Sequence, residues 1–185
     1  MSVFGPESTG KTTLAKRLAE HFDTVMVPEY ARIHLERQQG AISADDLPRI
    51  ARGQIASEDA LARDANRVLI CDTDPLATTI WSRELFGECE SWIDEEATRR
   101  AYDLTLLTDV DVPWVADQVR YLPENRRTFF ERCELALQTH QRTYVTLSGS
   151  WETRFTRACE AIEQALQTRF YQSDKTRRQE PGIGS

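Results

Sequence analysis

The chain has 185 residues, carries a formal net charge of −7 at pH 7 and contains 40% hydrophobic residues. This length suits a single domain whose core is large enough to fold without disulfides or metal ions. The acidic balance argues against a general nucleic-acid binder, and no apolar run approaches the roughly 20 residues that a membrane-spanning helix needs.

The four cysteines lie far apart in the sequence and form no C-x-x-C pair, so neither a zinc site nor a disulfide framework is predicted. The N-terminus lacks the charged and apolar pattern of a secretory signal peptide. We therefore expect a cytoplasmic protein with reduced thiols, whose partner is a small molecule rather than a nucleic acid or a membrane.

The first functional motif lies close to the N-terminus, where the sequence reads Gly5-Pro6-Glu7-Ser8-Thr9-Gly10-Lys11-Thr12. It fits the Walker A pattern G-x-x-x-x-G-K-S/T at every fixed position. Apolar Val3 and Phe4 precede it as the end of a strand would, and residues 13–22 follow with the apolar spacing of a helix. We predict a phosphate-binding loop whose nucleotide-binding residues are Gly5, Glu7, Ser8, Thr9, Gly10, Lys11, Thr12 and Thr13.

The fixed residues of this loop predict ATP and Mg²⁺ as ligands. The two glycines let backbone amides approach phosphate oxygens beside a helix N-terminus. Lys11 is expected to lie on the β- and γ-phosphates, and the Thr12 hydroxyl is expected to bind Mg²⁺. The plain alternative is a glycine-rich turn that only opens a helix, although such a turn has no need of the Lys-Thr pair.

A second strand is predicted at residues 24–27 and ends at Pro28, so that Glu29 and Tyr30 follow its carboxyl end. Open α/β sheets bind their ligands at that end of the strands, which makes both side chains candidates for substrate contact. Glu29 is also a candidate catalytic base. Its structural alternative is a salt bridge with Arg32.

The apolar run at residues 68–71 leads directly into acid at Asp72 and Asp74, the pattern of a buried parallel strand with carboxylates at its tip. Such a Walker B strand predicts that Asp72 holds Mg²⁺ together with Thr12. Asp72 also competes with Glu29 for the role of catalytic base. For Asp74 two interpretations stay open, which are substrate binding and capping of the helix that follows.

The segment from about 113 to 127 combines prolines, a tryptophan and three arginines, which suits a mobile lid. Arg120, Arg126 and Arg127 could fold over the nucleotide, balance charge on the transferred phosphoryl group and exclude water. Arg120 is the first choice for this catalytic role. Ordinary solvated arginines are the alternative.

The remaining patterns complete an alternation of strands and helices. Polar residues 171–185 are expected to form a disordered tail after a last helix that ends near residue 170. We predict an α/β P-loop NTPase fold, with a five-stranded parallel sheet and helices on both faces, in one kinase domain at residues 1–170. The other expected helices cover residues 31–39, 46–65, 75–86, 92–101 and 128–139, and the other strands residues 104–109 and 144–147.

A P-loop alone does not decide a function. The guanine-reading N-K-x-D of GTPases is absent from the sequence, and a motor or AAA-type ATPase usually needs a longer chain. Acids after two strands and arginines after a fourth fit a small phosphotransferase, which needs a base for the acceptor hydroxyl and cations for the phosphoryl group. A kinase of some other nucleoside or nucleotide and a P-loop regulator without kinase activity remain alternatives.

Six blocks of the sequence resemble the ribosylnicotinamide kinase domain of NadR-type proteins, which are P-loop kinases of an AAA-like ATPase/kinase family. They read G-P-E-S-T-G-K-T-T-L, V-P-E-Y-A-R, I-A-R-G-Q-I-A-S-E-D, I-C-D-T-D, P-W-V-A-D-Q-V-R and S-G-S-W-E-T-R-F, and the likeness spans about residues 3–170. The resemblance implies a nucleoside-monophosphate-kinase-like fold, ATP as donor, and phosphorylation of nicotinamide riboside to nicotinamide mononucleotide in NAD salvage. NadR-type proteins carry an adenylyltransferase domain upstream, and this sequence shows none.

The same resemblance carries roles over to individual residues. It implies phosphate binding by Gly10, Lys11 and Thr12. It also matches Glu29 and Tyr30 to the family's E-Y element, and Asp72 and Asp74 to its D-T-D element. It also brings three residues of the P-W-V-A-D segment to the site: Trp114, Asp117 and Arg120. In related nucleoside kinases the loop after the fifth strand lies by the adenine, which implies contacts from Ser150 and Trp151.

A cationic nicotinamide ring favours an aromatic face with a carboxylate nearby. Core packing is the usual role of any single aromatic residue. The aromatic candidates are Trp114 as first choice, Tyr30, Trp81 and Tyr102, and the carboxylate candidates are Asp117 and Asp74.

Overall fold

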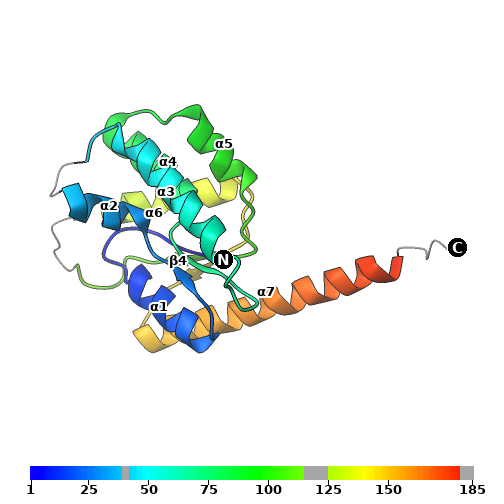
Figure 1. Ribbon diagram of the computed structural model, residues 1–185. Helices are drawn as coiled ribbons and strands as arrows, with labels where there is room; N and C mark the ends of the chain where they lie inside the picture. Colours follow the sequence, from blue (N-terminus) through cyan, green and yellow to red (C-terminus); the bar gives the residue numbers. More distant parts are fainter. Residues whose placement is uncertain (39–41, 115–124, 180–185) are drawn as a thin grey trace, which may run out of the picture.

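The computed structural model describes residues 1–38, 42–114 and 125–179, with side chains as far as residue 169. Five parallel strands in this part of the chain form one sheet in the order β2-β3-β1-β4-β5. The strands are β1 (Ser2–Phe4), β2 (Met26–Val27), β3 (Ile70–Asp72), β4 (Thr105–Thr108) and β5 (Tyr144–Leu147). The helices are α1 (Lys11–His21), α2 (Tyr30–Gln38), α3 (Asp46–Leu61), α4 (Pro75–Phe86), α5 (Ser91–Arg99), α6 (Arg126–Thr139) and α7 (Trp151–Gln179), as Figure 1 shows.

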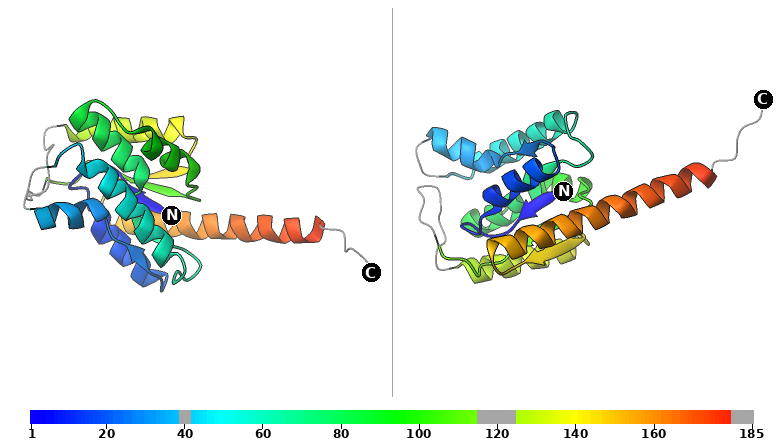
Figure 2. Two further views of the ribbon diagram at one scale, coloured as in Figure 1. Left: turned by 45° about the horizontal axis from the view of Figure 1, so that its top comes forward. Right: turned by 90° about the horizontal axis from the view of Figure 1, so that it is seen from below.

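Helices cover both faces of the sheet because neighbouring residues of a strand point to opposite sides. Val3 and Leu106 are buried in a core that they share with α1 and α7. The next residues along the two strands, Phe4 and Leu107, belong instead to a second core formed with α4 and α6. Figure 2 shows α7 beside α1. The predicted fold class is therefore confirmed, and so is the five-stranded parallel sheet.

Helix α4 follows directly from local sequence chemistry. Pro75 occupies its first turn, where no amide hydrogen is needed, and the Asp74 carboxylate accepts a hydrogen bond from the Leu76 amide at 2.8 Å. Gly87 ends the helix with a left-handed backbone, at φ 80°. The predicted span of residues 75–86 matches the observed one.

The C-terminal helix is longer than the sequence patterns predict. The expected disordered tail begins at residue 171, whereas α7 continues to Gln179, and residues 180–185 lie outside the described part of the chain. The prediction is wrong for residues 171–179, because it gave weight to their polarity. Polar residues without Gly or Pro continue a helix readily, and the first proline after Phe170 is Pro181. Figure 1 shows α7 extending past the rest of the domain.

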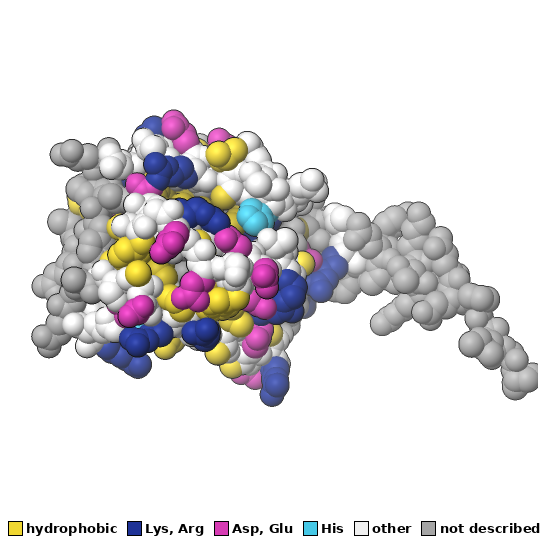
Figure 3. Space-filling view, turned by 90° about the horizontal axis from the view of Figure 1, so that it is seen from above, with side chains coloured by type: hydrophobic (Ala, Val, Ile, Leu, Met, Phe, Trp, Pro, Cys, Tyr) yellow, Lys and Arg dark blue, Asp and Glu magenta, His cyan; other side chains and the backbone are white. Residues whose placement is uncertain are grey.

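Three further features concern membrane-spanning helices, the cysteines and the surface charges. No helix in the described ranges combines the length and the apolar character that crossing a bilayer requires. All four cysteines carry free thiols. On the face seen in Figure 3, basic and acidic side chains are interspersed.

Candidate active site

The loop between β1 and α1 has a backbone that requires glycine at both ends. Gly5 has φ 131°, and a Cβ there would come within 2.7 Å of the Thr108 Oγ1 atom. Gly10 has φ 84° and caps α1, and a Cβ there would overlap the Trp151 ring at 1.9 Å. These angles and contacts exclude larger residues at the two positions.

Buried side chains from distant parts of the chain hold this loop in place. The Thr9 hydroxyl donates to the Pro6 carbonyl at 2.8 Å and lies 2.7 Å from the hydroxyl of Thr108 on β4. Arg154 of α7, which is fully buried, donates to the carbonyls of Thr9 and Asp109 at 3.1 Å each. The loop is therefore shaped by the protein itself.

Arg154 also pairs with the Asp111 carboxylate. Sequence reasoning missed this residue as part of the site. Its only signal was its place in the S-G-S-W-E-T-R-F block, because Thr9 and Asp109, the partners that connect it to the loop and to the end of β4, are more than 40 residues away in sequence.

The first turn of α1 meets the tip of β3 at a corner suited to Mg²⁺. Thr12 Oγ1 donates to Asp72 Oδ2 at 2.5 Å, and the Asp72 carboxylate is fully buried. Its second oxygen, Oδ1, has no hydrogen-bond partner among the described residues. A buried carboxylate oxygen of this kind calls for a cation or water. Since Mg²⁺ commonly binds through one or two protein oxygens together with phosphates and waters, the residues present fit it.

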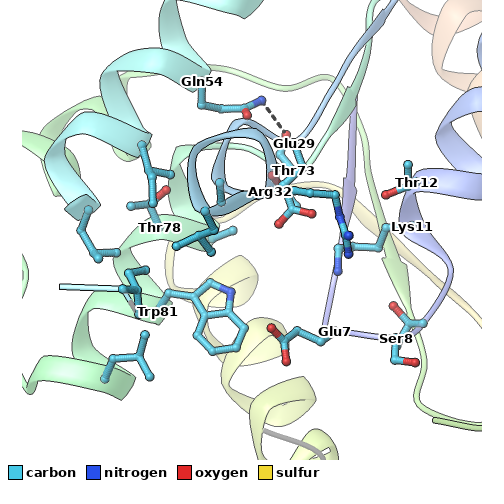
Figure 4. A pocket seen from close by; sticks show the side chains of 18 of the residues that line it. Glu7, Ser8, Lys11, Thr12, Glu29, Arg32, Gln54, Thr73, Thr78 and Trp81 are labelled. Carbon is cyan, nitrogen blue, oxygen red and sulfur yellow. Dashed lines mark hydrogen bonds between the residues drawn. The ribbon is translucent and has the colours of Figure 1, made fainter. Parts of the chain in front are cut away.

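Charge is concentrated where the loops after β2 and β3 face the phosphate-binding loop. Burial, and after it the negative charge of Glu29, raise the pKa of Asp72, while Lys11 and the hydrogen bond from Thr12 oppose the rise. Lys11 Nζ donates to the Pro6 carbonyl at 2.8 Å, so its ammonium group already lies over the loop. Figure 4 shows Glu29, Arg32 and Lys11 directed toward the same space.

A pocket extends from this charged corner to an apolar end. Gln54, Thr73 and Thr78 contribute polar groups between the two ends, and the ring of Trp81 faces the cavity across from Glu7 (Figure 4). The residues that line the pocket include residues of the phosphate-binding loop and of three helices, α2, α3 and α4. Its apolar end is lined by side chains of α2, α3 and α4 and of the segment before α3: Leu35, Ile42, Leu47, Ile50, Ala77, Trp81 and Leu85.

Two residues predicted to bind substrate have other surroundings. Both oxygens of Asp74 are engaged: one caps α4, and the other pairs at 2.7 Å with Arg142, whose side chain is 6% exposed, while Asp74 itself is buried. This favours the capping interpretation. Tyr30 is not among the residues that line the pocket, and its ring lies against Gly53, where a Cβ would come within 2.2 Å of it.

Of the other three aromatic candidates, Trp81, Trp114 and Tyr102, one lines the pocket. Trp81 lines the pocket, and its ring packs on Phe129 with 4.4 Å between ring centroids. Trp114, the first choice from sequence, is not among the lining residues and lies 5.7 Å from the Arg126 guanidinium. Tyr102 is held elsewhere by a hydrogen bond to Glu58 at 2.6 Å.

The remaining predicted residues lie around the phosphate-binding loop. Arg126, at the start of α6, donates to the Ser8 carbonyl at 3.2 Å, and the Trp151 ring lies beside Gly10. The Ser150 hydroxyl accepts from the Thr153 amide at 3.1 Å at the start of α7. Contacts of Trp151 and Ser150 with adenine stay a prediction. Asp117 and Arg120, with most of the expected lid, fall outside the described residues.

A family model described as an AAA domain matches residues 1–154. The chain belongs to this AAA domain family. The predicted membership of an AAA-like ATPase/kinase family is therefore confirmed.

The chain is similar to the "Trifunctional NAD biosynthesis/regulator protein NadR" of Escherichia coli and to the protein of the same name from Salmonella typhimurium. Each is 28% identical over 173 residues, which cover 90% of this chain and 42% of the relative. The chain thus spans less than half the length of these relatives. The predicted resemblance to NadR-type proteins is confirmed.

Solved structures agree on the fold. A crystal structure of NadR protein in complex with NR superposes with a TM-score of 0.74 at 24% identity, covering 90% of this chain and 51% of that one. A deoxyadenosine kinase from M. mycoides with bound dCTP gives a TM-score of 0.56 at 10% identity and covers 89% of this chain and all of that one, 100%. The fold of this chain is therefore a P-loop kinase fold.

The capping and pairing of Asp74 lead to a first prediction. Asp74→Asn keeps an oxygen for the Leu76 amide but leaves the buried Arg142 guanidinium without its counter-charge. We expect a loss of about 3–5 kcal/mol in the free energy of unfolding, the usual cost of breaking a buried ion pair. Urea denaturation measures it, with exposed Asp64→Asn as control. Unchanged stability together with weaker acceptor binding would return Asp74 to the substrate site.

Proposed function

We propose that this protein is an ATP-dependent kinase that phosphorylates nicotinamide riboside to nicotinamide mononucleotide in NAD salvage, in the cytoplasm. The observation that carries the proposal is a pocket that joins a phosphate-binding loop to an apolar end, with Glu29 lining the junction and Asp72 buried behind it in a hydrogen bond with Thr12. Support also comes from the relatives, which are described as NAD biosynthesis/regulator proteins, and from the related NadR structure with NR.

In this proposal the phosphate-binding loop holds the donor. The amides of Gly5–Thr12 and the Lys11 ammonium bind the β- and γ-phosphates, and Arg126 adds positive charge from the start of α6. Thr12 and Asp72 would hold Mg²⁺, which supplies charge neutralisation between the phosphates when bound. The Trp151 ring, which lies beside Gly10, would contact the adenine.

The chemical step then needs only a correctly placed acceptor. A ribose hydroxyl oxygen attacks the γ-phosphorus, the bond from that phosphorus to the β-bridging oxygen breaks, and ADP leaves. The hydroxyl proton passes to a carboxylate. We assign this role to Glu29, because Asp72 is engaged with Thr12 and the cation position. Trp81 and the apolar end would receive the base of the nucleoside.

A kinase of another nucleoside is the second candidate. It is favoured by the apolar end of the pocket, where aliphatic side chains and one indole ring would accept any flat base. The two candidates share the donor site and the chemistry and differ only in the acceptor.

The acceptor is identified by incubating the purified full chain with Mg-ATP and a panel of nucleosides and following ADP release. The proposal predicts turnover that depends on nicotinamide riboside, with nicotinamide mononucleotide as product. Turnover with thymidine, cytidine or adenosine alone would select the second candidate. Slow ATP hydrolysis that no acceptor accelerates would indicate a nucleotide-binding regulator instead.

The assignment of the base is tested with Glu29→Gln, which keeps size and hydrogen bonding but removes the proton acceptor. We expect kcat to fall by about 100-fold, within the usual range for a general base, while the Kd of Mg-ATP is retained. Steady-state kinetics and calorimetry measure the two quantities. Glu20→Gln on the exposed face of α1 is the matched control. An unchanged kcat would remove Glu29 from the mechanism.

The assignment of the base-binding aromatic residue is tested by comparing two tryptophans. We expect Trp81→Leu to raise the acceptor KM by about 10-fold or more, since a base stacked on an aromatic side chain gains roughly 1–3 kcal/mol. The KM for ATP should stay unchanged, and so should both values in Trp114→Leu. If only Trp114→Leu raises the KM of the acceptor, Trp114 and not Trp81 contacts the base.

A further inference from the structure

Gln54 occupies a central position that the mechanism above does not use. It lies in the middle of α3, lines the pocket and is only 3% exposed. Its side-chain carbonyl accepts a hydrogen bond from the Tyr30 amide at 3.0 Å. Its side-chain nitrogen donates to Glu58 Oε1 at 3.1 Å and lies 3.5 Å from the Thr73 carbonyl, the contact drawn as a dashed line in Figure 4.

These contacts connect the two loops that carry the carboxylates of the site. Tyr30 follows Glu29 directly and is the first residue of α2, so its amide has no acceptor within the helix. Thr73 follows Asp72 and has a left-handed backbone, with φ 69°, which is costly for a β-branched residue. Both loop positions therefore depend on partners outside their own segment.

The orientation of the Gln54 amide is fixed by its neighbour on the next turn of α3. Glu58 is 4% exposed and offers only acceptor oxygens when ionised, so it selects the nitrogen of Gln54 and leaves the oxygen for Tyr30. Glu58 is itself held by the Tyr102 hydroxyl at 2.6 Å and by Arg100 at 3.4 Å. With Glu58 ionised, the Gln54–Glu58 pair thus has one arrangement.

We propose that Gln54, oriented by Glu58, is a positioning residue that sets the distance between Glu29 and Asp72 for phosphoryl transfer. This inference rests on the proposed function. Gln54 touches neither reacting atom in this scheme. It acts on Glu29 through the Tyr30 amide and on the β3 tip through Thr73. A displacement of a reacting group by about 1 Å can lower the rate by about 100-fold. A contact that fixes the positions of Glu29 and Asp72 can therefore have a large effect on the rate.

The test uses substitutions that keep the volume of the pair. Gln54→Met removes the side-chain contacts with Tyr30, Glu58 and Thr73, and we expect kcat to fall by about 10- to 100-fold while the Kd of Mg-ATP is retained. Gln54→Glu places two carboxylates side by side in a buried site and should lower kcat as well. In the double variant Q54E/E58Q the donor and the acceptor are exchanged between the two positions, so the repulsion between two carboxylates is removed and the Tyr30 amide keeps its acceptor, while the Thr73 carbonyl loses its donor. The double variant should therefore regain part of the kcat that Gln54→Glu loses.

Two further measurements separate positioning from a loss of stability. Leu166→Ala on α7, in the core that α7 shares with the sheet and α1, should lower the unfolding midpoint without contacting either loop, and it should leave kcat close to the native value. Hydrogen exchange of the Tyr30 amide should accelerate in Gln54→Met more than exchange at β4. Equal kcat in Gln54→Met and the native chain, or no recovery in the double variant, would overturn the proposal.

Failure of the proposed function looks different. A native chain that transfers phosphate to no nucleoside contradicts the kinase assignment, and hydrogen exchange at Tyr30 still decides whether Gln54 fixes the loop. Unchanged exchange at Tyr30 in Gln54→Met overturns the positioning role in either case.

Discussion

The site depends on a phosphate-binding loop that is held in shape by buried hydrogen bonds from the other end of the chain. Arg154 and Thr108 reach Thr9 from α7 and β4, and neither belongs to the loop. If the loop were disordered before binding, the nucleotide would have to order it, and this ordering would reduce the free energy of binding. Here the ordering is supplied by folding, so the amide groups can face incoming phosphates from the start.

The parallel sheet brings the other participants to the same place. β1, β2 and β3 are neighbours, and their carboxyl ends lead into the phosphate-binding loop, Glu29 and Asp72 respectively. Residues from segments as far apart in sequence as Glu7 and Leu85 thereby line one pocket. The same arrangement concentrates charge, and the raised pKa of Asp72 reflects that crowding together with burial.

Features with local causes were predictable from sequence. The Walker A pattern, the Pro75-to-Gly87 helix and the alternation of strands and helices each depend on neighbours within a few residues. The roles of Asp74 and Arg154 depend on partners that sequence spacing does not indicate. Asp74 pairs with Arg142, 68 residues away, and the sequence left its capping role as one of two interpretations. Trp81 was one aromatic candidate among four, and only packing places it in the pocket.

The tail shows a different reason for error. Polarity predicts an absence of core contacts, but it does not predict an absence of helix, and α7 continues through polar residues. Little in the sequence indicated a role for Gln54, since a glutamine within a helix pattern is usually solvated. Its importance arises from the helix-start amide of Tyr30 and the strained backbone of Thr73, which are both properties of the folded chain.

The central claim is that this loop binds the phosphates of a nucleotide with the Thr12–Asp72 corner occupied by Mg²⁺. Titration of Mg-ATP into the full chain by calorimetry tests it most directly. The account predicts saturable binding at one site, which is strongly weakened in Lys11→Ala and by removal of Mg²⁺ with a chelator. A folded sample that gives no saturable heat with Mg-ATP, or the same heat in Lys11→Ala, would contradict it.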